Sequence, residues 1–497
     1  MRLVTIASIV AAAAAAQPVR TCESLTSVSL PNTTIESAAT EPAAANRPAF
    51  CRVTAVTTHP PAGDRIRIFI GLPLTGWNGR FEGVGGGGFS GGNPNGVVGP
   101  VAQGYAAGST DTGHEGGSGS FALDSAGRLN WLLIRDNAYF GIHEMTVTGK
   151  ALAQAFYGAA PRHSYFNGCS TGGRQGLSEA QRYPADYDGI LSGAPAINWT
   201  RLHVEQMWGT VVMLAAKNPV PQCKFAAAQA AAVAACDAAD GVKDGVIENP
   251  RACTFDPKVL VGTSAGSCGD FTEADADVIR KIWQGPRRLD GSFIWYGLQR
   301  GADFMGLSAT GGAPLVPRPN PITLEWWRYF LMQNPQWDYM SLTPAAYEQY
   351  VDQSVEEFSA VLATDNPDLT AFRDRGGKLV LWHGWSDQLI YPEGTIDYYQ
   401  RVQKQMGGPE NTSKFARPFL APGVAHCGGG PGPTPDGQFA AVVRWVEEGQ
   451  APKTLNAVRR EQGVVVRTRP LCQFPLVAKY KGAGSTDEAA NFVCAAQ

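Results

Sequence analysis

Residues 168–172 read Gly-Cys-Ser-Thr-Gly and fit the pattern G-x-S-x-G. In this pattern a serine occupies a sharp turn between a strand and a helix, and glycines flank it because side chains would clash there. Five residues alone match by chance in a glycine-rich chain, so the surrounding sequence matters. Residues 164–167 are typical of a short strand and residues 173–182 of a helix. The chain is therefore predicted to present Ser170 as a nucleophile at the end of a strand.

The rest of the chain alternates in the same way. Apolar patterning predicts further strands and helices, namely strands at 65–70, 80–84, 104–109, 378–382 and 415–420, and helices at 138–158 and 439–448. Such alternation favours an α/β fold with a mostly parallel sheet covered on both faces. The pattern breaks between about residues 198 and 376, which are rich in alanine, tryptophan and proline. We expect one core (17–200 and 371–497) interrupted by a lid (201–370), with independent tandem domains as the lesser alternative.

The order of residues after Ser170 indicates a catalytic triad. In α/β-hydrolases the serine is followed first by an acid and then by a histidine. Asp387 follows the predicted strand at 378–382, and His426 is the only histidine after it. His426 would take the proton of Ser170, while Asp387 would orient the imidazole ring. A loop-capping role is the plain alternative for Asp387, and Asp397, the nearest competitor, falls in a helical stretch.

Two cysteines adjoin the predicted triad. Cys169 immediately precedes Ser170, and Cys427 immediately follows His426. Since the serine and histidine must meet, their neighbours can reach the Cα separation of about 4.4–6.8 Å that a disulfide requires. We expect a Cys169–Cys427 bridge that clamps the two catalytic loops together.

The amino terminus and the cysteine content predict export. Residues 1–16 carry one arginine and then an uncharged apolar run, which is typical of a signal peptide and shorter than the roughly 20 residues of a membrane span. Ten cysteines are most simply read as five disulfides, which suit a secreted or periplasmic protein. We expect no membrane association after cleavage. The net charge of −3, with no basic stripe, argues against nucleic-acid binding.

Beyond the triad, the sequence resembles the tannase and feruloyl esterase family over nearly the whole chain after residue 16. The resemblance implies an α/β-hydrolase core with a large lid insertion that shapes the pocket, and hydrolysis of esters of aromatic carboxylic acids. It rests on the segments Trp77–Phe81, Gly85–Phe89, Thr110–His114, Tyr165–Gly176, Arg182–Pro184, Asp188–Ile190, Gly193–Pro195, Trp382–Asp387 and Ala425–Cys427.

The oxyanion hole is predicted from the motif and from the resemblance together. One donor is the backbone N–H of the residue after the nucleophile, Thr171, and the other comes from the loop after an earlier strand. The four glycines 85–88 form that loop in the sequence, and a backbone without side chains can approach the developing oxyanion closely. Gly86 and Gly87 are the predicted donors.

An acidic segment in the predicted lid, residues 236–247, suggests a structural calcium site. Three aspartates lie within eight residues, and Ca²⁺ takes six to eight oxygen ligands. From the residues alone, a solvated acidic turn is as good an interpretation. The resemblance implies a calcium loop here, with ligands from the side chains of Asp237, Asp240 and Asp244 and the carbonyls of Val242 and Val246. It also implies a Cys236–Cys253 bridge.

Six cysteines remain besides the Cys169–Cys427 and Cys236–Cys253 pairs. Local bridges are expected for Cys22–Cys51 and Cys472–Cys494. Cys223–Cys268 is then assigned by exclusion.

The substrate is predicted only by class. Aromatic side chains in the lid, with Trp326 and Trp327 foremost, would suit a flat acyl group such as feruloyl, galloyl or terephthaloyl, although each ring could equally belong to the lid core. His383, beside the acid loop, is a predicted substrate contact. The expected partner is a small aromatic ester, while the oligomeric state stays open. An acyltransferase using the same triad is the alternative function, and a non-catalytic binding protein the weakest.

Overall fold

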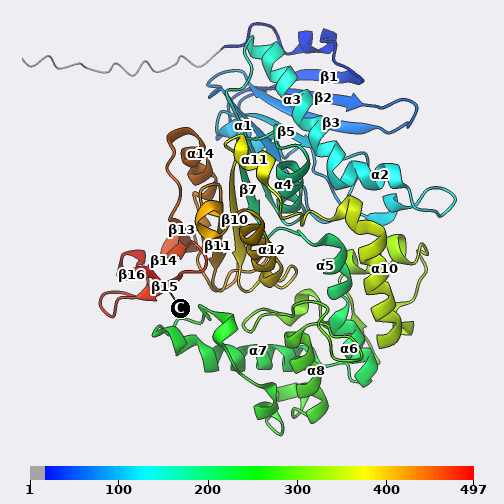
Figure 1. Ribbon diagram of the computed structural model, residues 1–497, viewed down its shortest axis with the longest axis vertical. Coiled ribbons are helices and arrows are strands. Elements are labelled where there is room, and N and C mark those ends of the chain that lie inside the picture. Colours follow the sequence, from blue (N-terminus) through cyan, green and yellow to red (C-terminus); the bar gives the residue numbers. More distant parts are fainter. Residues whose placement is uncertain (1–16, 497) are drawn as a thin grey trace, which may run out of the picture.

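The computed structural model describes residues 17–496, so the predicted signal peptide at 1–16 lies outside the described residues. A nine-stranded mixed sheet runs through the molecule (Figure 1) in the order β1-β2-β3-β5-β4-β6-β7-β10-β11. Its strands are β1 (Thr33–Glu41), β2 (Phe50–Thr57), β3 (Ile66–Pro73), β4 (Arg80–Val84), β5 (Ala106–Thr110), β6 (His163–Cys169), β7 (Gly189–Gly193), β10 (Lys378–Gly384) and β11 (Ala416–Ala421).

Neighbouring strands in the series β5-β4-β6-β7-β10-β11 pair in parallel. Neighbouring strands in the series β1-β2-β3-β5 pair antiparallel. Every strand predicted from apolar patterning is present. A further strand lies before residue 47, where the apolar pattern predicted none. Thr33–Glu41 forms the edge strand β1, in which Ile35 is buried and most other side chains are partly or fully exposed. Backbone pairing with β2 holds this polar segment in the sheet, and such pairing leaves little apolar signal in the sequence.

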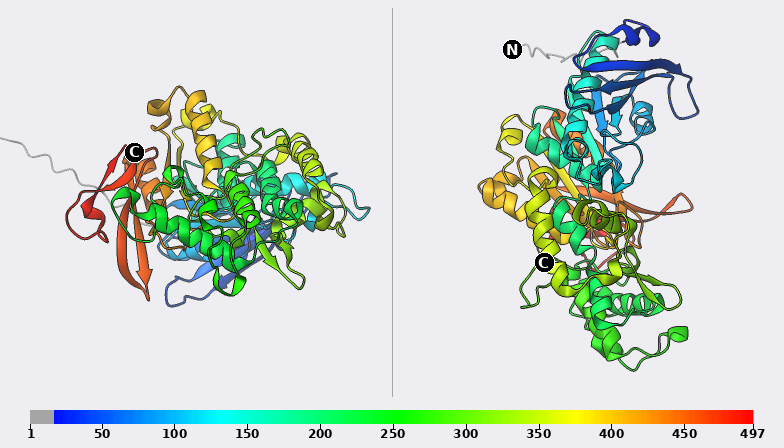
Figure 2. Two further views of the ribbon diagram at one scale, coloured as in Figure 1. Left: turned by 90° about the horizontal axis from the view of Figure 1, so that it is seen from below. Right: turned by 90° about the vertical axis from the view of Figure 1, so that its right-hand side faces the viewer.

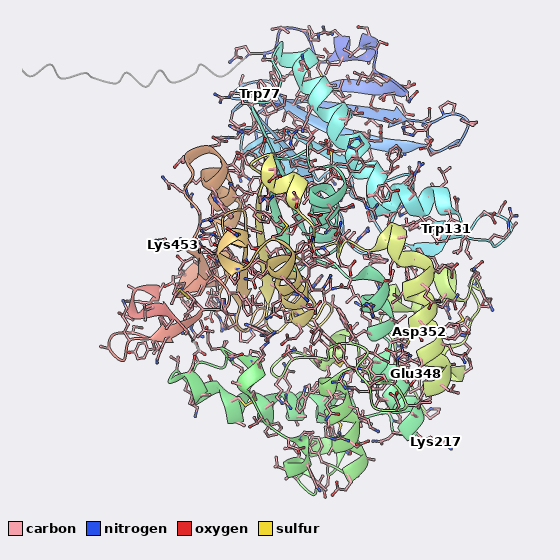
Figure 3. All side chains as sticks on the ribbon, viewed as in Figure 1. Trp77, Trp131, Lys217, Glu348, Asp352 and Lys453 are labelled. Carbon is pink, nitrogen blue, oxygen red and sulfur yellow. A yellow bond between two sulfur atoms is a disulfide. The ribbon has the colours of Figure 1, made fainter. Side chains whose placement is uncertain are left out.

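Helices cover both faces of the sheet, as the alternating pattern predicted. One face packs against α3 (Gly141–Tyr157), α4 (Thr171–Arg182), α11 (Thr370–Asp374) and α12 (Pro392–Gln405). The other face packs against α14 (Gln438–Glu448) and α1 (Val98–Ala102). Trp77, labelled in Figure 3, is buried on the first face and stacks on Tyr157 with 3.9 Å between ring centroids.

Residues 194–377, called here the helical region, leave the sheet after β7 and return at β10, which pairs with β7 in parallel. Figures 1 and 2 show most of this region at the end of the molecule opposite β1, while α11 lies beside α4. It has its own buried clusters of apolar side chains. Besides α11, its elements are α5 (Trp199–Glu205), α6 (Trp208–Ala216), α7 (Gln222–Cys236), α8 (Glu273–Gln284), α9 (Pro321–Glu325), α10 (Pro344–Leu362), β8 (Ala309–Gly311) and β9 (Val316–Arg318).

The remaining short elements are α2 (Trp131–Arg135), α13 (Pro409–Thr412) and five strands after β11 that the sequence did not predict. Those strands form two small sheets, of β12 (Thr434–Asp436), β13 (Thr454–Glu461) and β14 (Val464–Cys472), and of β15 (Val477–Tyr480) and β16 (Phe492–Ala495). Side chains of this carboxyl-terminal part pack against Val242 of the helical region. Residues far apart in the sequence thereby meet beside the acidic segment.

All five predicted disulfides are present: Cys22–Cys51, Cys169–Cys427, Cys223–Cys268, Cys236–Cys253 and Cys472–Cys494. No helix within residues 17–496 is both long and apolar enough to cross a membrane.

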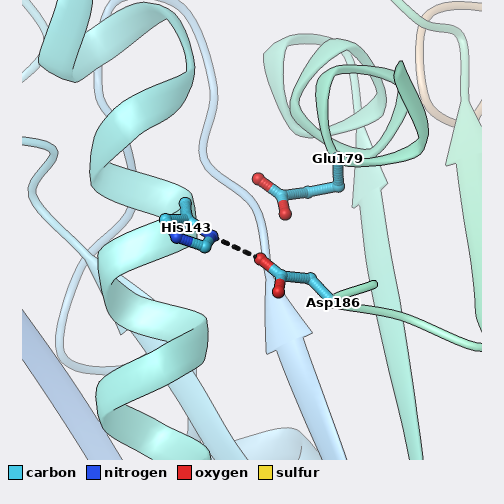
Figure 4. A group of neighbouring side chains, drawn as sticks. All are labelled: His143, Glu179 and Asp186. Atoms are coloured by element: carbon cyan, nitrogen blue, oxygen red, sulfur yellow. Dashed lines mark hydrogen bonds and ion pairs between the residues drawn. The ribbon is translucent and has the colours of Figure 1, made fainter. Parts of the chain in front are cut away.

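A buried polar group joins α3 to α4 (Figure 4). Nδ1 of His143 lies 2.7 Å from Oδ2 of Asp186, and Glu179 lies beside them. Burial, together with the negative charge of Asp186, raises the pKa of Glu179 well above its ordinary value. The His143–Asp186 hydrogen bond links α3 to the segment that follows α4, so we assign this group to packing between the helices.

Candidate active site

Ser170 occupies the turn between β6 and α4, where the motif predicts the nucleophile. Its backbone has a φ of 64° and a ψ of −123°, a conformation that side chains rarely adopt and that costs about 1–3 kcal/mol. The N–H of Ser170 donates to Gly193 O at 2.9 Å, which ties the turn to the end of β7. A Cβ atom at Gly168 would lie 2.4 Å from the backbone of Gly172, so the glycine is required by this close approach.

Asp387 follows β10 and His426 follows β11, and their side chains meet. Nδ1 of His426 lies 2.8 Å from Oδ2 of Asp387. The Asp387 side chain is fully buried, whereas that of His426 is 14% exposed. Oδ1 of Asp387 accepts hydrogen bonds from the backbone N–H groups of Leu389 and Ile390, both at 2.9 Å. Burial by itself would raise the pKa of Asp387, but the charge of His426 and hydrogen bonds from two histidines outweigh it and lower the pKa below its ordinary value.

The second of these histidines is His383, which was predicted to contact substrate. The structure places it elsewhere, because its side chain is fully buried within the core. Its Nε2 lies 3.0 Å from Oδ2 of Asp387 and 2.8 Å from Ile390 O. Both partners only accept, so Nε2 carries a hydrogen, and Nδ1 is left to meet the hydroxyl of Thr395 at 2.9 Å. His383 therefore holds Asp387, the predicted catalytic acid, and does not line the cavity that contains Ser170.

The Cys169–Cys427 disulfide joins the serine turn to the histidine loop. The two Cα atoms are 5.9 Å apart, and the cysteines are separated by 258 residues in the sequence. Cys427 also has a positive φ of 57°, so both loops have unusual backbone conformations next to the catalytic side chains. The bridge fixes one loop relative to the other at the point where proton transfer must occur.

Ser170 and His426 line one cavity of about 410 Å³. We call it the catalytic cavity. Its lining consists of Gly86, Gly87, Gly88, Cys169, Ser170, Thr171, Ala196, Trp199, Leu202, His203, Gln206, Asn320, Ile322, Leu389, Ile390, His426 and Cys427. Residues of the helical region supply much of the wall opposite the nucleophile. The volume falls in the range of pockets that bind small organic ligands, roughly 300–1,000 Å³.

Trp326 and Trp327, the other predicted substrate contacts, do not line this cavity. Both side chains are completely buried. Trp326 stacks on Phe330 with ring centroids 4.4 Å apart, and Trp327 stacks on Trp337 at 5.4 Å. They belong to the core of the helical region, where large aromatic side chains remove the most apolar area from water.

Apart from Ser170, Thr171 and His426, the aromatic and polar side chains that line the cavity were not singled out by sequence. His203 and Gln206 lie on and just after α5, and Nδ1 of His203 is 2.9 Å from Oε1 of Gln206. Nε2 of Gln206 donates to Leu389 O at 2.8 Å, which fixes the orientation of the amide. Burial lowers the pKa of His203 to about 3, against a smaller opposite effect of the Gln206 hydrogen bond. His203 is accordingly neutral in the cavity wall.

The two glycines predicted for the oxyanion hole already use their N–H groups. Gly86 donates to Oε1 of Gln175 at 2.9 Å, and Gly87 donates to Ser90 O at 3.1 Å. Within residues 17–496, the N–H of Gly88 has no hydrogen-bond acceptor, and Thr171, the first residue of α4, has no earlier helical carbonyl to bond. Oγ1 of Thr171 donates to Gly88 O at 2.6 Å and ties these two residues together.

Gln175 is a positioning residue that sequence reasoning missed. Its Oε1 accepts from the N–H of Gly86, and its Nε2 donates to Gly91 O at 3.1 Å. Gln175 therefore holds the segment from Gly86 to Gly91 at both ends. A signal was available, because Gln175 lies four residues after Thr171 and the two must share one face of α4.

The acidic segment forms a tight loop whose carboxylates bond mainly to its own backbone. Asp237 accepts from the N–H groups of Asp244 and Gly245, both at 3.0 Å, and Asp240 accepts from Val242 at 2.9 Å. Oδ2 of Asp244 also accepts from Arg469 of β14 at 2.8 Å. Among residues 17–496, only His143, Glu179 and Asp186 bring three ligand atoms within 4.8 Å of one another, so the loop carboxylates do not converge to that degree.

Comparison with known proteins assigns the class. The chain is 40% identical over 484 residues to a protein named probable feruloyl esterase from Arthroderma benhamiae, covering 94% of this chain and 87% of that protein. It is 32% identical over 533 residues to mono(2-hydroxyethyl) terephthalate hydrolase from Piscinibacter sakaiensis, covering 91% and 86%. The structure of tannin acyl hydrolase from Aspergillus niger superposes with a TM-score of 0.85 at 25% identity, covering 96% and 95%.

An α/β fold that carries this serine site, with such relatives, defines the protein as a carboxylic ester hydrolase. The sequence model described as "Tannase and feruloyl esterase" matches residues 51–495. The chain belongs to the tannase and feruloyl esterase family.

Proposed function

We propose that this protein is a secreted serine esterase that hydrolyses esters of aromatic carboxylic acids through an acyl-enzyme. One observation carries the proposal: Ser170 and His426 line the same cavity, and Asp387 binds Nδ1 of His426 from the buried side. This is the arrangement that a nucleophile, a general base and an orienting acid require.

In the proposed reaction, Oγ of Ser170 attacks the ester carbonyl carbon while Nε2 of His426 accepts the hydroxyl proton. The tetrahedral intermediate collapses as the C–O bond breaks, and His426 returns the proton to the leaving alcohol. Water then attacks the acyl-serine by the same route and releases the acid. Asp387 keeps its negative charge throughout and stabilises the imidazolium.

For the oxyanion hole we propose the N–H groups of Thr171 and Gly88. Gly88 replaces the predicted Gly86 and Gly87, whose N–H groups bond within the loop. Its φ of 59° favours glycine, and a Cβ atom there would approach Ile322 of α9 to 3.3 Å. Alanine keeps the N–H but strains this backbone, so we expect Gly88→Ala to displace the donor and to lower kcat by up to about 100-fold, the loss seen when an oxyanion donor is removed.

We propose an aromatic acyl group as the substrate because Trp199 and aliphatic side chains of the helical region line the same cavity as Ser170. In this proposal the helical region acts as the predicted lid. The names of the relatives agree with aromatic esters as substrates. Acyl transfer to an alcohol would use the same triad, but nothing in the comparisons supports it.

The test is labelling and turnover. A fluorophosphonate probe should modify Ser170, identified by peptide mass spectrometry, and should abolish hydrolysis of methyl ferulate and methyl gallate. Adding glycerol as acceptor should leave free acid as the main product. Modification of another residue with full loss of activity would contradict the assignment, and a glyceryl ester as main product would favour the transferase.

Export and calcium remain part of the proposal. The five disulfides support an oxidising compartment. Three aspartates and nearby carbonyls are the oxygen donors that Ca²⁺ prefers, so the donor chemistry of the acidic loop fits the ion. Asp237, Asp240 and Asp244, with the carbonyls of Val242 and Val246, would hold it, and the ion would stabilise the loop.

A further inference from the structure

The catalytic cavity has a feature that separates the candidate substrates. None of the Asp, Glu, Lys and Arg side chains within residues 17–496 lines it. Its ionisable lining residues are His426, which belongs to the triad, and His203. Because burial lowers the pKa of His203 to about 3, that ring contributes no positive charge near neutral pH.

Most polar atoms of the side chains that the helical region contributes to the lining are engaged, but Nε1 of Trp199 and Nε2 of His203 have no hydrogen-bond partner within residues 17–496. Oε1 of Gln206 meets His203 at 2.9 Å and the hydroxyl of Thr323 at 3.0 Å, while its Nε2 donates to Leu389 O. Nδ2 of Asn320 donates to Gly306 O at 3.1 Å. What remains for a ligand is mainly the apolar surface of side chains such as Leu202 and Ile322.

A nearby cation, Arg174, does not change this picture. Its guanidinium lies 4.4 Å from the centroid of the Trp199 ring, and the side chain is completely buried outside the cavity lining. Its N–H groups donate to the carbonyls of Asn137, Ala138 and Leu362. Its Nε has no partner, but Arg174 does not line the cavity, so it forms no ion pair with a ligand there.

From these observations we infer that the catalytic cavity selects aromatic acyl groups that carry no negative charge, and that it discriminates against esters with a free carboxylate on the ring. An anionic group that leaves water needs a cation or several hydrogen-bond donors. The lining supplies no cation, Nε1 of Trp199 is a single unpaired donor, and Nε2 of His203 only accepts because Nδ1 donates to Gln206. The inference rests on the proposed function and narrows it. Among the acids considered, uncharged feruloyl-type groups fit, whereas a terephthalate monoester does not.

The test compares two esters of one size. Dimethyl terephthalate and monomethyl terephthalate differ in one methyl group and one negative charge. Each kcat/KM at pH 7 is divided by the rate of alkaline hydrolysis of the same ester, because a carboxylate also makes the ring less electron-withdrawing. We expect the corrected value to be about 100-fold or more lower for the monoester. Equal corrected values would overturn the inference.

A charge introduced in the wall gives the reciprocal test. Ile322 is partly buried and lies on the short helix α9 that faces the glycine loop. Ile322→Arg should improve the monoester relative to the diester by about 10-fold, since the new cation pairs with the carboxylate. Ile322→Gln, which is polar but uncharged, should leave the ratio near that of the wild type. The same gain in both variants would mean that polarity or space, and not charge, sets the preference.

The experiments on the wild type distinguish failure of the inference from failure of the proposed function. Hydrolysis of methyl ferulate and of both terephthalate esters with equal corrected efficiency would leave the proposed function intact and refute the charge selection. Failure to hydrolyse methyl ferulate and dimethyl terephthalate would refute the proposed function, and the inference with it.

Discussion

The two sides of the catalytic cavity are built in different ways. On the core side, Ser170, Asp387 and His426 follow the carboxyl ends of β6, β10 and β11, and hydrogen bonds and a disulfide fix them. On the other side, much of the wall comes from the helical region, is largely apolar and carries no formal charge. In the proposed function, the rigid side performs the chemistry, and the other wall selects which ester can reach it.

The largest effect is expected on the core side. Ser170→Ala removes the nucleophile, so we expect kcat to fall by about 10³-fold or more with the fold unchanged. Hydrolysis of methyl ferulate and circular dichroism measure the two properties. Ser413→Ala, at the partly exposed residue that follows α13, is the control and should retain full activity. Wild-type turnover by the Ser170 variant would show that the core side does not perform the chemistry.

A variant of His383 tests whether this residue holds Asp387 on the core side or contacts the substrate. If it holds Asp387, then His383→Ala should lower kcat about 10- to 100-fold, because a hydrogen bond to a buried charged group is lost, and should change KM little. A substrate contact would show the opposite pattern, with KM rising and kcat preserved. His163→Ala, at a partly exposed histidine at the start of β6, should change neither constant.

The Cys169–Cys427 disulfide, called the clamp below, tests how much the activity depends on a fixed position of His426 relative to Ser170. Cys169→Ala combined with Cys427→Ala should lower the free energy of unfolding by about 2–5 kcal/mol, as loss of a native disulfide does. Activity per folded molecule should also fall about 10-fold, because a small shift of His426 misaligns proton transfer.

The matched control for the clamp is the Cys472→Ala, Cys494→Ala pair, which removes a disulfide of the carboxyl-terminal sheets. It should reduce stability without reducing activity per folded molecule. Equal activity losses in the two double variants would contradict a special role for the clamp.

Calcium removal should have the smallest effect, on the helical region. A ligand bound only by the native state stabilises it, so excess chelator should lower the melting temperature by about 2–5 °C. In Asp240→Asn the melting temperature should already be reduced, and chelator should change it little further. An unchanged melting curve in the wild type, with no calcium by elemental analysis, would remove the site.

The sequence by itself determined the reacting groups, because each has a local signature. Glycines on both sides of Ser170 indicate that other backbone segments approach closely. Ser170, Asp387 and His426 each follow a predicted strand, in the order known for α/β-hydrolases. The Cys169–Cys427 bridge was predictable for the same reason, since two residues that must react bring their neighbours together.

Only the tertiary structure decided what surrounds those groups. An aromatic side chain such as Trp326 looks the same in sequence whether it lines a cavity or fills a core, and here it fills the core. His383 and Gly86 likewise found partners that no local pattern specifies, in Asp387 and Gln175. Local spacing fixes which atoms can react, whereas the packing of distant segments fixes which side chains remain exposed to a substrate.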